Sequence, residues 1–186
     1  MRVISGALKG KSINFLKNLK TRPLKDSVKE NIFNILDHSN LLKIKIENSN
    51  VLDLYSGVGS FGIECISRGA HRVTFVENDK NASNVLGKNL DNLSIIKKTE
   101  IYNCEIENFL SHKFKQQFDI VFLDPPFADF KFINSLKTLK NKNILNKKHI
   151  VIIHREKKTE DNLKGLLDII LMKQYGRSKI IYGVLN

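Results

Sequence analysis

The chain has 186 residues, 41% hydrophobic and 27% charged, with 31 lysines and arginines against 19 acidic residues, a formal charge of +12. This composition fits a folded domain with a sizeable core and excludes collagen-like, mucin-like and wholly disordered chains. The positive charge favours a polyanionic partner, most commonly a nucleic acid. However, 25 of the basic residues are lysine, an excess that an AT-rich genome alone would also produce.

The cysteine content and the lengths of the hydrophobic runs further narrow the possible classes of protein. The two cysteines, Cys65 and Cys104, are too few for a disulfide framework or a four-ligand zinc site. The sequence opens with no signal region, and its apolar runs are far shorter than a membrane span. We therefore expect a reduced, soluble, cytoplasmic protein that needs no metal.

The N-terminal segment differs in composition from the rest. Its first 25 residues hold seven basic side chains and no acidic one. Residues 2–4 and 12–15, separated by a turn over 6–10, predict a basic hairpin. Apolar residues at helical spacing then predict a helix over 26–36. We expect residues 1–38 to form a basic extension and residues 39–186 the main domain.

From residue 51 onward, short apolar strands alternate with helices. Strands are predicted at 51–55, 73–77, near 97–103, 118–123 and 149–154, helices at 61–68, 80–90 and 130–139, and a closing hairpin at 166–185. This alternation is typical of an α/β protein with a mainly parallel sheet and helices on both faces. Because such sheets bind ligands beyond the carboxyl ends of their strands, we expect the site in the loops after residues 55, 77, 103 and 123.

The loop after the first predicted strand carries a Gly-x-Gly-x-x-Gly pattern. It consists of Gly57, Gly59 and Gly62, and Glu77 ends the second strand. Glycines allow close backbone approach to a ligand, and the acid can accept hydrogen bonds from ribose hydroxyls. A dinucleotide site has the same spacing. Asp53 distinguishes the two, because a carboxylate there repels a pyrophosphate and attracts a cationic amino-acid end. The pattern favours S-adenosylmethionine over NAD.

An Asp-Pro-Pro-Phe sequence at 124–127 follows the fourth predicted strand. The two prolines stiffen the backbone and donate no N–H, so the carbonyls of Asp124 and Pro125 are available as acceptors. With the Asp124 carboxylate they suit an exocyclic amine on a planar base, and Phe127 offers a stacking face. Aligning such an amine with a methyl group requires neither a metal nor a covalent intermediate. The loop therefore predicts methyl transfer to an exocyclic amine.

Together, residues 53–62 and 124–127 resemble the class I S-adenosylmethionine-dependent methyltransferases. Further segments narrow the resemblance to the RsmD family, the 16S ribosomal RNA guanine-N2 methyltransferases. These segments are Arg2-Val3-Ile4-Ser5-Gly6, Lys9-Gly10-Lys11, Thr21-Arg22-Pro23, Val28-Lys29-Glu30 and Phe33-Asn34-Ile35-Leu36. The resemblance implies a Rossmann-like, seven-stranded sheet whose last strand is antiparallel, preceded by a small N-terminal hairpin and helix.

The resemblance also implies roles for individual residues. The implied cofactor residues are Asp53, Tyr55, Ser56, Gly57, Gly59, Glu77, Asn78 and Glu105, with Asp53 and the glycines near the methionine part, Glu77 on the ribose and Glu105 near the adenine. The implied catalytic residues, around the target guanine, are Asp124, Pro125, Pro126 and Phe127, with residues 22–30 beside the catalytic pocket. Separately, the basic composition of the first 25 residues leads us to expect that Arg2, Lys9, Lys11 and Arg22 bind the RNA. The implied partner is 16S rRNA, in the 30S subunit or an assembly intermediate, bound by a monomer. Two positions depart from the family pattern: the family more often has Thr where this chain has Leu24, and Asp or Asn where it has Glu105.

Other interpretations remain open. The same acceptor loop serves methylation of adenine N6 in DNA or of a glutamine amide in a protein, and an NAD-dependent oxidoreductase or a non-catalytic RNA-binding protein represents a different class. Asp53 argues against NAD, and intact Asp124 and Gly57 argue against a purely binding role. None of the five histidines has metal-ligand spacing, so we assign them no function. The lysines between 137 and 148 fit a solvated face as well as an RNA contact.

Overall fold

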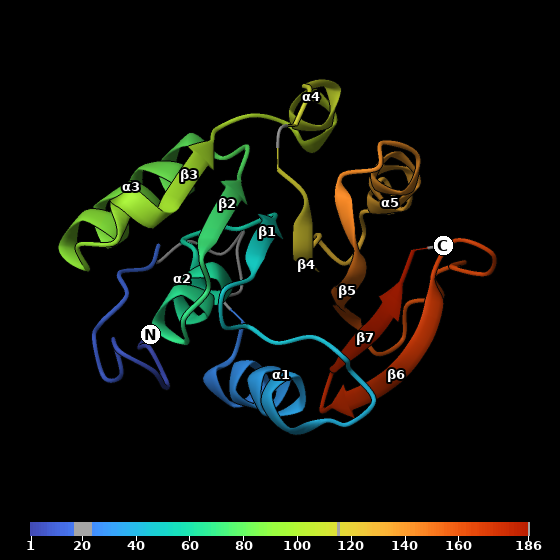
Figure 1. Cartoon of the computed structure of the whole chain (residues 1–186), viewed down its shortest axis with the longest axis horizontal. Helices are drawn as coiled ribbons and strands as arrows, with labels where there is room; N and C mark the ends of the chain where they lie inside the picture. Colours follow the sequence, from blue (N-terminus) through green and yellow to red (C-terminus); the bar gives the residue numbers. More distant parts are fainter. Residues whose placement is uncertain (17–23, 115, 186) are drawn as a thin grey trace.

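The sheet has seven strands, as the family resemblance implies (Figure 1). The computed structural model describes residues 1–16, 24–114 and 116–185. The strands are β1 (Asn50–Leu54), β2 (Arg72–Val76), β3 (Thr99–Tyr102), β4 (Phe118–Leu123), β5 (Leu145–Glu156), β6 (Asp168–Tyr175) and β7 (Ser178–Val184). Their order is β3-β2-β1-β4-β5-β7-β6; β1 to β5 are parallel and β7 is antiparallel to both neighbours. The expected α/β class and antiparallel last strand are confirmed.

The helices connect successive strands. They are α1 (Asp26–His38), α2 (Ser60–Ser67), α3 (Lys80–Asn92), α4 (Ile106–Ser111) and α5 (Phe132–Asn141), with a 3-10 turn η1 (Ile96–Lys98). The predicted helices occur within two residues of the expected bounds, but α4 was not predicted because six residues are too few to show a helical period. None of the described helices is long and apolar enough to span a membrane.

Two hydrophobic clusters cover the two faces of the sheet. Ile120 and Phe122 point to the face that packs against α1, α2 and α3, whereas Val121 and Leu123 point to the face covered by α4 and α5. Successive side chains of a strand alternate between faces, so an unbroken apolar run is what a doubly covered strand requires. In Figure 1, α4 and α5 lie above the row of strands and α1 lies below it.

The N-terminal segment forms the expected hairpin, held by one antiparallel bridge, Arg2 to Ser12. The flanking backbone hydrogen bonds run from the Val3 N–H to the Lys11 carbonyl and from the Ile13 N–H to the Met1 carbonyl. Val3 and Ile13 are buried in the same cluster as α1 and α2. The hairpin therefore packs directly on the main domain, at the lower left of Figure 1.

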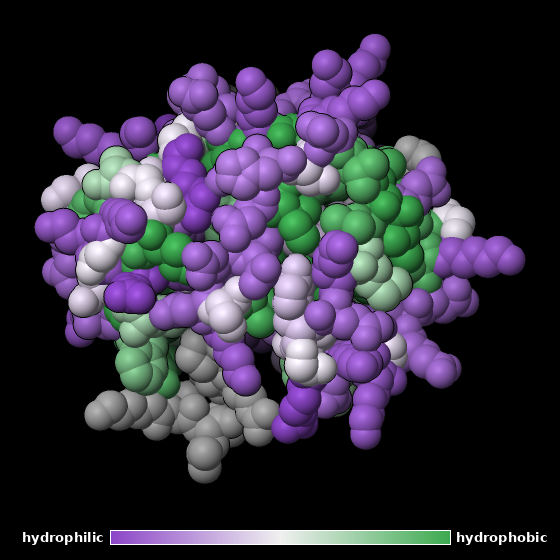
Figure 2. All heavy atoms as spheres, turned by 90° about the horizontal axis from the view of Figure 1, so that it is seen from below, coloured by the Kyte–Doolittle hydropathy of each residue, from purple (hydrophilic) through white to green (hydrophobic). Residues whose placement is uncertain are grey.

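The face seen in Figure 2 is mainly hydrophilic. Hydrophobic area gathers on the side on which β6 and β7 lie in Figure 1. β6 is the edge strand there, and its exposed apolar side chains are Ile169, Ile170 and Met172.

Candidate active site

The glycine loop turns sharply out of β1 through residues with left-handed backbone. Tyr55, Gly57 and Gly59 have φ values of 59°, 55° and 87°. A side chain at Gly59 would be strained by the left-handed backbone, and its Cβ, 2.4 Å from Leu86 Cδ1, would displace that leucine, so the position favours glycine. A Cβ on Gly57 would meet nothing within 4 Å. The loop is therefore packed against the protein at Gly59 and open at Gly57, as close backbone approach to a ligand requires.

Two carboxylates, those of Asp53 and Glu77, accept hydrogen bonds from backbone N–H groups in and beside this loop. Asp53, 1% exposed, accepts a hydrogen bond from the Gly62 backbone N–H at 3.0 Å. Glu77 accepts from the N–H of Gly57 at 2.7 Å and from that of Asp79 at 2.8 Å. The twenty-residue spacing between Gly57 and Glu77 thus corresponds to a direct contact between them.

The electrostatics of these acids favour a cationic ligand. Burial raises the pKa of Asp53 well above its usual range, and the neighbouring charges of Asp124 and Glu77 raise it further. Burial also raises the pKa of Glu77, against the opposing effect of its backbone donors. A positively charged group beside Asp53 would relieve this cost by favouring the ionised carboxylate.

A small pocket continues from the loop along the ends of β2 and β3. Its lining is formed by Tyr55, Val76, Glu77, Asn78, Cys104, Glu105 and Ile106. Asn78 donates a hydrogen bond from Nδ2 to Glu105 Oε1 at 3.0 Å, which links the two polar walls. Burial raises the pKa of the Cys104 thiol, so this sulfur is a poor nucleophile. The pocket combines apolar walls with the acceptors that a nucleoside needs.

The Asp-Pro-Pro-Phe loop leaves β4 at the same edge. His154 Nδ1 lies 2.8 Å from Asp124 Oδ1, and His154 Nε2 lies 2.9 Å from Ser178 Oγ. An ionised carboxylate only accepts hydrogen bonds, so Nδ1 donates to Asp124, while Nε2 pairs with the Ser178 hydroxyl. The rings of Phe127 and His154 meet edge to face at 5.7 Å. The sequence assigned His154 no function, and the structure places it in contact with the predicted catalytic carboxylate.

Arg155, the next residue of β5, binds the second half of this loop, Pro126 and Phe127. Arg155 is fully buried and donates to the carbonyls of Pro126 and Phe127, each at 3.0 Å. Its Nε donates to Asp161 at 3.0 Å. The carbonyls of Asp124 and Pro125 accept no hydrogen bond from any residue that the structure describes. They are thus available as the predicted acceptors.

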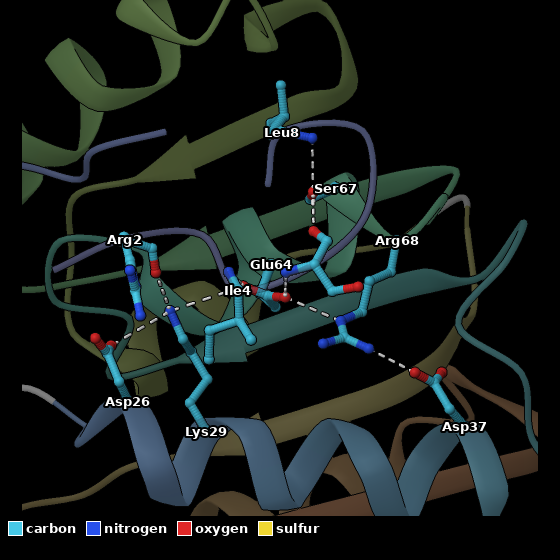
Figure 3. Close-up of polar contacts among 10 residues, drawn as sticks. Arg2, Ile4, Leu8, Asp26, Lys29, Asp37, Glu64, Ser67 and Arg68 are labelled. Atoms are coloured by element: carbon cyan, nitrogen blue, oxygen red, sulfur yellow. Dashed lines mark hydrogen bonds and ion pairs between the residues drawn. The ribbon is translucent and has the colours of Figure 1, made fainter. Parts of the chain in front are cut away.

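A buried network fixes the hairpin to α2 (Figure 3). The Glu64 carboxylate accepts from the backbone N–H groups of Ile4 at 2.7 Å and Ser5 at 2.9 Å, and from Arg68 Nε at 2.9 Å. Lys29 of α1 lies 3.8 Å from Glu64 and donates to the carbonyl of Arg2. Burial lowers the pKa of Lys29, an effect that the charge of Glu64 opposes. The hairpin, α1 and α2 therefore share one charged centre.

A second contact joins the hairpin to the glycine loop. Asn89 of α3, 1% exposed, accepts from the Asn14 N–H and donates to the carbonyls of Asn14 and Val58 at 3.0 and 3.1 Å. The limb that ends at Asn14 therefore lies beside the predicted cofactor loop. The opposite end of the hairpin is fixed at Ser67, the last residue of α2, whose hydroxyl accepts from the Leu8 N–H.

The predicted RNA-binding residues fall in three places. Arg2, Lys9 and Lys11 are exposed on the hairpin, and Arg22 lies outside the described residues. The lysines between 137 and 148 run from α5 into the start of β5. The start of β5 is the edge of the sheet opposite to Asp124, because β4 and β5 are parallel. Lys147 and Lys148 are thus remote from the predicted acceptor loop.

The residues present fit S-adenosylmethionine. The loop is open at Gly57, the buried Asp53 carboxylate favours a cation, and the Ser56 hydroxyl is a buried polar group with no partner among the described residues. No group of three or more histidine, cysteine, aspartate or glutamate side chains in the described ranges could hold a metal. The arrangement can bind a cationic nucleoside-like ligand beside a rigid loop of hydrogen-bond acceptors.

Sequence reasoning missed His154, Arg155 and Asn89. They act through residues that are distant in sequence, and no motif marks them. The one available signal was polarity within an apolar strand: His154 and Arg155 interrupt the end of a buried run that begins at Ile150. A buried polar residue requires a partner, which is a reason to look for one.

Comparison with known proteins agrees with this geometry. Residues 1–184 match the family model described as "Conserved hypothetical protein 95". Ribosomal RNA small subunit methyltransferase D of Haemophilus influenzae is 36% identical over 159 residues, which covers 84% of this chain and 79% of that protein. A solved Escherichia coli protein assigned as a methyltransferase, YhhF, superposes with a TM-score of 0.83 at 25% identity, covering 100% and 98% of the two chains. A Haemophilus influenzae structure assigned as a methylase gives 0.77 at 31% identity, with the same coverage.

Proposed function

The chain belongs to the RsmD family of S-adenosylmethionine-dependent methyltransferases, and on that premise we propose that it methylates the exocyclic N2 of a guanine in 16S rRNA. The supporting observation is the shared position of three acids, Asp53, Glu77 and Asp124, at the carboxyl edge of the sheet. Asp53 is the penultimate residue of β1, and Glu77 and Asp124 directly follow β2 and β4. Two of them adjoin the open glycine loop, and the third begins the acceptor loop.

In this proposal each cofactor residue contacts a different part of S-adenosylmethionine. Asp53 receives the ammonium end, the Gly57 backbone approaches the methionine part, and Tyr55, Ser56 and Gly59 complete the loop. Glu77 accepts from the ribose hydroxyls, while Asn78 and Glu105 border the adenine. When bound, S-adenosylmethionine supplies a methyl group on a sulfonium, an electrophile that needs no metal.

The acceptor loop then orients the nucleophile. The target guanine leaves its stack, at a cost of a few kcal/mol. One N–H of its N2 amine donates to the Asp124 carboxylate, and the other donates to a backbone carbonyl, that of Asp124 or Pro125. This localises the nitrogen lone pair, and Phe127 stacks on the base. Once N2 is methylated it carries a surplus proton, which Asp124 is placed to accept. Orientation of this kind can contribute about 7–11 kcal/mol toward a barrier.

We propose that residues 1–38 form the RNA-facing extension of a methyltransferase domain at 39–186. Arg2, Lys9, Lys11 and Arg22 contact the RNA backbone, and the substrate is the 30S subunit or an assembly intermediate in the cytoplasm, bound by a monomer. The support is the absence of acidic residues from the first 25 positions and the contact of the hairpin limb with the glycine loop through Asn89.

The proposal is tested by incubating the protein with labelled S-adenosylmethionine and unmethylated 30S subunits. The wild type should label the 16S rRNA, and Asp124→Ala should reduce labelling to background. Asp119→Asn, which alters a carboxylate at the opposite end of β4, is the matched control and should retain activity. Near-normal labelling by Asp124→Ala would overturn the catalytic assignment.

A further inference from the structure

We propose that Arg155 is a positioning residue for methyl transfer, which fixes the acceptor loop from inside the protein and thereby sets the geometry of Asp124 and Pro125. This inference rests on the proposed function, because it gives the loop its role. Arg155 belongs to no sequence motif that identifies the family, and its contribution is visible only from its contacts.

The contacts are directional. The guanidinium donates from Nη1 to the Pro126 carbonyl and from Nη2 to the Phe127 carbonyl, both at 3.0 Å. The planar, rigid fork of a guanidinium fixes the relative position of two acceptors, which a lysine ammonium cannot do. Two consecutive peptide groups are therefore held in one orientation directly after the acceptors that the proposal assigns to the substrate.

Arg155 is itself held in place. Its side chain is fully buried, and Nε donates to Asp161, whose side chain is 1% exposed. The guanidinium lies 4.7 Å from the ring centre of Phe132 and 5.5 Å from that of Phe130. The buried guanidinium is surrounded by a carboxylate, two carbonyls and an aromatic face. It therefore has few alternative positions.

Asp161 has a second cation, which provides a matched control. Lys179 of β7 lies 3.2 Å from Asp161 Oδ2 and donates to the Thr159 carbonyl, but it makes no described contact with residues 124–127. Arg155 and Lys179 thus share one buried carboxylate and differ in whether they reach the acceptor loop. A purely structural role would make the two equivalent.

Arg155 and His154 act on opposite sides of the loop. Side chains alternate along β5, so His154 faces the Asp124 carboxylate while Arg155 reaches Pro126 and Phe127 from the α5 side. The two contacts are independent, and loss of Arg155 leaves the Asp124–His154 hydrogen bond in place. The expected defect is a loosened backbone after Asp124, with the cofactor site intact.

The test compares wild type, Arg155→Lys and Lys179→Met. Initial rates on unmethylated 30S subunits give kcat and KM, calorimetry gives the Kd for S-adenosylhomocysteine, and hydrogen exchange measures a peptide covering 124–130. We expect Arg155→Lys to lower kcat by about 10- to 100-fold, the scale of a displaced reacting group. The same variant should exchange faster in this peptide and keep its Kd. Lys179→Met should lower the Tm but keep kcat and the exchange rate.

An Arg155→Lys protein with wild-type kcat and exchange would overturn the inference, as would an equal loss of kcat in Lys179→Met. If Arg155→Lys does not fold, the same measurements are made on Asp161→Asn, which removes the carboxylate that holds the Arg155 guanidinium in place. A wild type inactive on 30S subunits would overturn the proposed function instead, and the exchange comparison would still test whether Arg155 fixes the loop.

Discussion

His154 Nδ1 lies 2.8 Å from Asp124 Oδ1, across neighbouring strands. The register pairs Leu123, the last residue of β4, with Ile153 of β5, so the residues that follow them, Asp124 and His154, lie side by side at the carboxyl edge of the sheet. The histidine occupies one carboxylate oxygen, and Asp124 Oδ2 accepts no hydrogen bond from the described residues. One oxygen is therefore fixed, and the other is available to a substrate amine.

Replacing His154 should affect the reaction without affecting cofactor binding. A hydrogen bond to a charged group contributes about 1.5–3 kcal/mol, so we expect His154→Ala to lower kcat by roughly 10- to 100-fold. The Kd for S-adenosylhomocysteine should remain unchanged. His149→Ala, five residues before His154 on the same strand, is the control. A His154→Ala enzyme with wild-type kcat would show that the carboxylate needs no such orientation.

The sequence predicted the scaffold well, because its evidence was local. Apolar strands, left-handed glycines and the prolines after Asp124 each determine the backbone structure of only a few neighbouring residues. The Gly57–Glu77 contact was also accessible, since a βαβ unit brings the ends of consecutive strands together. By contrast, Asn89 contacts Asn14 across 75 positions, and no period or motif encodes such a pairing.

Asp53→Asn should stabilise the protein while removing cofactor binding. Burial raises the Asp53 pKa, so between its ordinary value of 3.8 and that raised pKa the folded state binds more protons than the unfolded state. The stability of the wild type therefore falls as pH rises through this window. The amide carries no charge and avoids this loss.

We expect Asp53→Asn to have the higher Tm near neutral pH, with the difference shrinking toward pH 4, by about 2–4 °C for each kcal/mol gained. Calorimetric melts across this range check the Tm, and titration should show weakened binding of S-adenosylhomocysteine. Asp91→Asn, an exposed site, should change neither quantity. Unchanged affinity in Asp53→Asn would remove the argument for a cationic ligand at this site.

Glu64→Gln should destabilise the fold and release the hairpin. It removes the buried carboxylate beside Lys29 and leaves that ammonium only the partly exposed Asp26 at 4.0 Å, and removing one partner of a buried ion pair costs about 3–5 kcal/mol. Urea unfolding should show this loss, and the Ile4 and Ser5 amides should exchange faster. Lys29→Met combined with Glu64→Gln should recover part of the stability; a double variant less stable than Glu64→Gln would contradict the assigned pairing.

Charge reversal on the hairpin should weaken RNA binding. Each phosphate contact contributes about −0.7 to −0.9 to the slope of log K against log salt. Lys9→Glu with Lys11→Glu should therefore lower affinity for 16S rRNA and flatten that slope. Lys147→Glu with Lys148→Glu makes the same change of charge at the start of β5, at the edge of the sheet opposite to Asp124, and should have a smaller effect. Equal effects would show that the hairpin is not the preferred contact.

The central claim is that this enzyme methylates guanine N2, and identification of the modified nucleoside tests it most directly. Unmethylated 30S subunits are incubated with labelled S-adenosylmethionine, and the 16S rRNA is then digested and its nucleosides separated. We predict that the label appears in N2-methylguanosine, at one site, and is absent after reaction with Asp124→Ala. Label in N6-methyladenosine or in ribosomal protein, or none in the RNA, would contradict the proposal.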